Sequence, residues 1–106
     1  MTDGTEAPLD LAPFDAAAYL TEAEDQDALL AEAFASGDAG FIAHALGAVA
    51  RARGMAQLAR ETGIKRQQLY RALSRDGNPT LETLLKVTRA LGLRVTAART
   101  EMADPA

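Results

Sequence analysis

Residues 65–74 combine the side-chain types that read duplex DNA. Arginine can fork onto guanine and glutamine onto adenine, while lysine and serine contact phosphate. Leu69 and Leu73 are spaced to share one side of a helix, together with Ala72, and would face inward. The opposite side then carries three cations, an amide and an aromatic hydroxyl but no acid: Lys65, Arg66, Gln67, Tyr70, Arg71 and Ser74. A solvated helix surface is the alternative interpretation of this face, and Tyr70 fits the edge of a core equally well.

The elements before this face must hold it outward. The pattern predicts a short helix over residues 55–61, a turn at Thr62-Gly63-Ile64, and a second helix over residues 65–74. Two short helices joined by a glycine-containing turn are the helix-turn-helix layout. Gly63 suits a turn that needs a positive φ, and Ala59 is small enough for a helix crossing. A small core is expected beneath the turn: Leu58, Ile64, Leu69 and Leu73.

Capping signals predict three further helices and one shorter one. Thr21 to Glu24 match a capping box, so a helix should begin there and end at Gly37, with an inward face of Ala23, Leu29, Leu30, Ala33 and Phe34. Asp38 should cap the next helix, which should end at Gly54 and bury Phe41, Ile42, Ala45, Leu46 and Val49. Thr80 should cap the last helix, with an inward face of Leu81, Leu84, Leu85, Thr88 and Leu91. Residues 14–20 suggest a short helix capped by Asp15. Residues 93–96 are either one short strand, for which a second copy of the chain could supply the partner, or an extended tail.

Charge is distributed very unevenly along the chain. Residues 1–40 hold ten acidic and no basic residues, while residues 41–106 hold all eleven basic and five acidic residues. The formal charges are therefore −10 and +6, which together give the net charge of −4. The second part is suited to a polyanion, whereas the acidic first part would repel one and attract a basic partner. Solubilisation of the N-terminal helices is the alternative reason for the acids.

The sequence offers no set of residues for catalysis or for a cofactor. The chain has no cysteine and one histidine, His44, so thiolate metal sites and two-imidazole mechanisms are excluded. No nucleophile motif and no phosphate-binding glycine loop is present, so we expect no enzyme activity, no metal and no cofactor. No apolar run reaches the ~20 residues of a membrane span, and we expect a cytoplasmic protein without membrane contact.

The block LARETGIKRQQLYRALS followed by GNPTLETLLKVTRALGL resembles the Cro/repressor (Xre-type) helix-turn-helix domain. FDAAAYL at residues 14–20 and ALGAVARARGM at residues 45–55 make the chain similar to addiction-module antidote proteins related to HigA antitoxins. The resemblance covers about residues 14–95. Many relatives have serine where Lys65 stands; serine would cap the second helix and lysine cannot, so the DNA sequence that is read should differ between relatives.

This resemblance implies an all-α fold of five to six short helices around a lambda-repressor-like core, with or without one short C-terminal strand. Residues 1–13 would be an arm, residues 14–96 one domain (acidic helices over 14–54, the helix-turn-helix core over 55–96) and residues 97–106 a tail. The family implies a homodimer that represses its own operon and neutralises a small basic toxin of the RelE/ParE type.

Carried onto this chain, the resemblance places the DNA contacts on the predicted outward face: Lys65, Arg66, Gln67, Tyr70, Arg71 and Ser74. The toxin contacts would come from the N-terminal segment: Phe14, Tyr19, Leu20, Glu22, Glu24, Asp25 and Asp27. A stand-alone phage-type regulator without a toxin and a module that binds only protein remain the alternatives.

Overall fold

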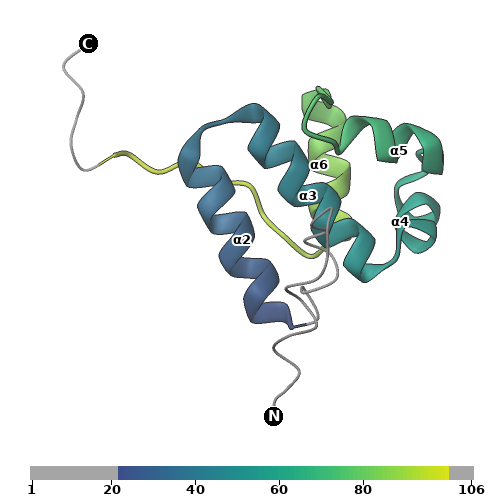
Figure 1. The fold of residues 1–106 in the computed structure, drawn as a ribbon, viewed down its shortest axis with the longest axis horizontal. Helices are drawn as coiled ribbons and strands as arrows, with labels where there is room; N and C mark the ends of the chain where they lie inside the picture. Colours follow the sequence, from purple (N-terminus) through teal and green to yellow (C-terminus); the bar gives the residue numbers. More distant parts are fainter. Residues whose placement is uncertain (1–21, 101–106) are drawn as a thin grey trace, which may run out of the picture.

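The computed structural model describes residues 22–100, which fold into five α-helices and contain no β-strand (Figure 1). The helices are α2 (Ala23–Ser36), α3 (Ala39–Arg53), α4 (Met55–Thr62), α5 (Arg66–Ala72) and α6 (Leu81–Ala90). The predicted all-α class is therefore confirmed, and the arrangement of α4 and α5 is compatible with a helix-turn-helix. Within residues 22–100, no helix is long and apolar enough to cross a bilayer. The predicted arm, the short helix over residues 14–20 and the end of the tail from residue 101 lie outside the described residues.

Helix α3 is the centre of the fold. It packs against α2 on one side and against α4 and α5 on the other, while α6 packs on α4 (Figure 1). Its inner positions are mostly alanine, and Ala45, Ala48 and Ala50 are completely buried. Small side chains let the neighbouring helices approach closely, and larger side chains fill the remaining space. The largest fully buried side chains are Leu46, Val49, Leu69, Leu73 and Val87.

Gly47 marks the closest approach between α3 and the end of α5. A Cβ atom at this position would overlap the backbone carbonyl oxygen of Leu73, the residue that caps α5. Glycine in a helix interior costs about 1 kcal/mol relative to alanine. The contact with Leu73 explains why the chain carries glycine in the middle of its central helix.

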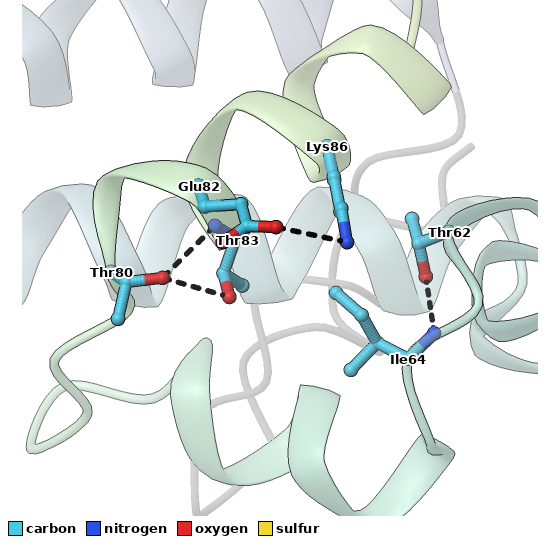
Figure 2. Close-up of polar contacts among 6 residues, drawn as sticks. All are labelled: Thr62, Ile64, Thr80, Glu82, Thr83 and Lys86. Atoms are coloured by element: carbon cyan, nitrogen blue, oxygen red, sulfur yellow. Dashed lines mark hydrogen bonds and ion pairs between the residues drawn. The ribbon is translucent and has the colours of Figure 1, made fainter.

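Most predicted helix ends are confirmed because local hydrogen bonds fix them. The Asp38 carboxylate accepts hydrogen bonds from two backbone amides of α3, at 2.9 and 3.2 Å. The Thr80 hydroxyl accepts from the amide of Thr83 at 3.1 Å (Figure 2). Helices α2 and α3 end at Gly37 and Gly54, as the sequence predicts.

The start of α2 differs from the capping-box prediction. Glu22, not Thr21, is the N-cap, and its side chain makes no capping hydrogen bond. The helix begins one residue later because the Glu22 carbonyl accepts the first amides, those of Asp25 and Gln26. The predicted inward position of Ala23 is also wrong: Ala23 is exposed, and Gln26 is buried one turn further along.

The predicted inward face of α6 is wrong in part. Leu81 and Leu85 are exposed, and the side that faces the core consists of Leu84, Val87, Thr88 and Leu91. Both stripes have the i, i+3, i+4, i+7 spacing and share Leu84, Thr88 and Leu91, so periodicity alone does not separate them. The packing of α6 on α4 selects the stripe that contains Val87.

After α6, the chain runs in an extended form alongside α2 (Figure 1). The Leu93 amide donates to the Thr88 carbonyl at 2.8 Å, which fixes the start of this segment. Residues 93–100 form no strand with any described part of the chain. Residues 93–96 are thus extended in the single chain, and their pairing with a second copy stays a prediction.

Candidate nucleic-acid interface

The turn between α4 and α5 is held by hydrogen bonds from both of its sides. The Thr62 hydroxyl donates to the Leu58 carbonyl at 2.8 Å and accepts from the Ile64 amide at 3.2 Å (Figure 2). Gly63 has a φ of 75°, and its amide donates to the Ala59 carbonyl at 2.9 Å. A left-handed φ is costly for residues with a Cβ, so this glycine allows the chain to reverse. The turn therefore sets the direction of α5 relative to α4.

Two leucines anchor α5 to the rest of the protein. Leu69 is completely buried and Leu73 is nearly so, and both belong to the main hydrophobic core. Ile64 and Ala59 pack against the same core from the turn and from α4. The predicted core beneath the turn is thus present, and burial of Leu69 and Leu73 turns the opposite side of α5 toward solvent.

The outward side of α5 carries the residues that the sequence singles out. Lys65, Arg66, Gln67, Tyr70 and Arg71 are exposed, whereas Ser74 is half-buried. Lys65 is the N-cap of α5 and makes no side-chain capping hydrogen bond, as expected for lysine. Within residues 22–100, no carboxylate forms an ion pair with Lys65, Arg66 or Arg71. Their charges are therefore available to an anionic partner.

Two local contacts organise this surface. The Arg66 guanidinium carbon lies 5.9 Å from the centre of the Tyr70 ring, within the range of a cation–π contact. The Ser74 hydroxyl donates to the Arg71 carbonyl at 2.9 Å, just beyond the end of α5. The hydroxyl of Ser74 is thus already engaged by the backbone, while Arg66 and Tyr70 are paired and exposed to solvent.

The acidic residues lie at the other end of the molecule. Glu22, Glu24, Asp25 and Asp27 are all exposed at the start of α2. Helix α2 packs on α3 on the side away from α5 (Figure 1). Among residues 22–100, the acids of α2 therefore do not cover the cationic side of α5.

Arg53 has a structural role that spacing alone does not reveal. Its Nε donates to the Gln26 side-chain oxygen at 2.7 Å, and its Nη1 donates to the Leu91 carbonyl at 3.0 Å. One guanidinium thus joins the start of α2, the end of α3 and the end of α6. From the sequence, Arg53 offers either a phosphate contact or a favourable interaction with the C-terminal end of the helix dipole. Its actual partners are 27 and 38 residues away in the sequence, so spacing does not indicate them.

Other chemistry is not supported by the described residues. Residues 22–100 contain no group of three or more histidine, cysteine, aspartate or glutamate side chains that could hold a metal ion. His44 is half-buried in α3 and has a bonding partner of its own. The predicted toxin-contact residues Phe14, Tyr19 and Leu20 lie outside the described residues.

Comparisons with known proteins agree with the resemblance to addiction-module antidote proteins. Residues 10–99 match a family model described as a probable addiction module antidote protein. An uncharacterised protein of Haemophilus influenzae is 46% identical over 84 residues, which cover 79% of this chain and 87% of the relative. No solved structure matches the chain.

Proposed function

Since the chain belongs to the family of probable addiction module antidote proteins, we propose that it is the antitoxin of a toxin–antitoxin pair. In this proposal it also represses its own operon, as a homodimer that binds operator DNA through α5. It neutralises a small basic toxin of the RelE/ParE type by direct contact in the cytoplasm.

The exposed, unpaired cationic side of α5 supports the DNA-binding part of the proposal. A helix enters the major groove of B-DNA, which is ~12 Å wide, when its reading face is free and its other side is anchored. Leu69 and Leu73 provide the anchor, and Arg66, Gln67 and Arg71 provide donors that match base edges and phosphates. Ser74 is a weaker candidate than the other five, because its hydroxyl already donates to a backbone carbonyl.

The acidic start of α2 supports the toxin-binding part. Four exposed carboxylates attract a basic protein and accelerate its association, and α2 lies away from α5. The two partners would therefore bind different ends of one molecule. In the proposal, the apolar residues Phe14, Tyr19 and Leu20 add the contacts that charge alone does not supply.

A band-shift titration tests DNA binding directly. The duplex is the region upstream of the protein's own gene, and Arg71→Ala is compared with Arg94→Ala, an exposed arginine beside α2. Loss of a base-contacting arginine costs about 1–3 kcal/mol, so Arg71→Ala should weaken specific binding about 5- to 150-fold. Equal affinities for the two variants would contradict the assignment of α5 as the reading helix.

Co-purification tests toxin binding. The chain is expressed with the protein encoded by the adjacent reading frame, and Glu24→Lys with Asp27→Lys is compared with Asp76→Lys, an exposed acid outside α2. The α2 variant should lose toxin at moderate salt, whereas the control retains it. Specific DNA binding without any captured partner would instead support the stand-alone regulator, and no retention on duplex DNA at low salt would support a module that binds only protein.

A further inference from the structure

Helix α6 presents an apolar surface that no described part of the chain covers. Leu81 is 67% exposed and Leu85 is 46% exposed, one helical turn apart. Glu82 and Arg89 lie beside Leu85 on the side of α6 that points away from the core, because Leu84, Val87 and Leu91 face inward. The two leucines are neighbours on one side of the helix, and it is contiguous apolar exposure, not single exposed side chains, that marks a contact surface.

The surface beside these leucines is hollowed. A groove of about 640 Å³ runs between α6 and the end of α4, and it is lined by Glu61, Thr62, Glu82, Leu85, Lys86, Arg89 and Ala90. Glu82 and Lys86 form an ion pair at 3.4 Å along its α6 wall (Figure 2). The groove therefore offers an apolar wall next to charges of both signs, and a leucine side chain would fit into it.

The order of the charges along α6 identifies what binds there. The acid, Glu82, lies toward the N-terminal end of the helix, and the cations Lys86 and Arg89 lie toward its C-terminal end. If two α6 helices pair in opposite directions about a two-fold axis midway between Leu85 and Lys86, residue 82 of each copy comes opposite residue 89 of the other. An acid then meets a cation twice, whereas a parallel pair would place like charges together.

We infer that the Leu81–Leu85 surface of α6 is where a second copy of this chain docks, antiparallel and two-fold symmetric. The groove beside this surface carries two acids, Glu61 and Glu82, and two cations, Lys86 and Arg89. With no excess of either sign, it suits a partner that carries the same mixed charges better than it suits a strongly basic toxin or polyanionic DNA. The assignment rests on the proposed homodimer and names its contact surface. None of the exposed α5 residues belongs to this surface, so dimerisation leaves the reading face free.

The size of the surface sets the expected strength of the dimer. Two leucines and their charged neighbours cover much less than the ~800 Å² per partner of a standard stable interface. The free chain should therefore be in a concentration-dependent equilibrium between monomer and dimer. Operator DNA with two half-sites about 34 Å apart would strengthen the dimer, because each copy holds the other in place.

Disulfide trapping tests the inference cleanly because the native chain has no cysteine. Leu85→Cys is compared with Tyr70→Cys on α5 and Val95→Cys on the extended tail, whose side chains are 43% and 41% exposed, close to the 46% of Leu85. Under mild oxidation, Leu85→Cys should form a covalent dimer several-fold faster than either control. Circular dichroism of each variant confirms that the exposed substitution leaves the fold intact.

A second pair of variants tests the direction of the helices. Glu82→Cys mixed with Arg89→Cys should cross-link faster than either variant alone, because residue 82 meets residue 89 only in the antiparallel arrangement. Faster linkage of Glu82→Cys to itself would overturn the antiparallel pairing. Faster linkage of Val95→Cys than of Leu85→Cys would overturn the choice of surface in favour of the tail.

Sedimentation velocity of the unmodified chain separates failure of this inference from failure of the proposed function. A dimer in solution with no preferential trapping at residue 85 would refute only the α6 surface. A monomer at every concentration, with or without operator DNA, would refute the homodimer itself. DNA binding through α5 is judged independently by the Arg71→Ala band shift.

Discussion

Replacing Gly47 with alanine should destabilise the protein even though alanine is the better helix former. The helix-propensity term favours the variant by about 1 kcal/mol. Against this, the new Cβ overlaps the Leu73 carbonyl oxygen, so α3 and the end of α5 must separate by roughly 1.5 Å to reach an ordinary carbon–oxygen contact. Overpacking of this kind costs about 1–3 kcal/mol, and the cost is at the upper end here because the obstructing atom is backbone. The net loss should be about 1–2 kcal/mol.

Urea denaturation followed by circular dichroism measures this loss. Ala52→Gly, at an exposed position of the same helix, measures the propensity term separately and should cost up to about 1 kcal/mol. The melting temperature of Gly47→Ala should fall by about 4–8 °C for each kcal/mol lost. A Gly47→Ala chain that is more stable than the parent would refute the close packing of α3 on α5, and with it the described placement of the reading helix.

Three further predictions test the remaining contacts. Arg53→Met should lower the free energy of unfolding in urea by about 1–3 kcal/mol, because the buried Gln26 loses its guanidinium donor. Arg94→Met is the control, and an equal loss of stability in that variant would contradict the role given to Arg53. Asp38→Ala should lower the free energy of unfolding by about 1 kcal/mol because α3 loses its N-cap, whereas Asp38→Asn should keep most of this stability. An alanine variant as stable as the parent chain would contradict the capping role of Asp38. The logarithm of the DNA association constant should fall linearly with the logarithm of the salt concentration, and the slope should be about one unit shallower for Lys65→Ala. An association constant of the parent chain that does not change with salt would contradict a phosphate-dominated interface.

Local signals predicted the helix ends well, because the hydrogen bonds that fix them are local. Asp38 and Thr80 cap the helices that follow them, and Gly37, Gly54 and Gly63 lie where helices end. Contacts between distant residues were harder to predict. The Arg53–Gln26 pair spans 27 residues. Spacing alone places position 26 on the same side of α2 as Leu30 and Ala33, but a polar glutamine is not expected in a core.

The candidate site was predicted where one side of a helix was unambiguous. In α5, Leu69 and Leu73 leave only one way to face the core, so the outward residues followed directly. In α6, two overlapping stripes of apolar residues fit the same spacing, and only tertiary packing separates Leu85 from Val87. The leucine stripe that the core leaves exposed is the same one that we assign to the second copy, which explains why α6 carries apolar residues on two sides.

The central claim, that the outward side of α5 binds duplex DNA, is tested most directly by nuclear magnetic resonance. The ¹⁵N-labelled full chain is titrated with a duplex from its own upstream region, and amide shifts are followed residue by residue. The largest changes should fall on Arg66, Gln67, Tyr70 and Arg71, with little change at the acidic start of α2. Changes centred on α2 or on the extended tail, or no changes at low salt, would contradict the account.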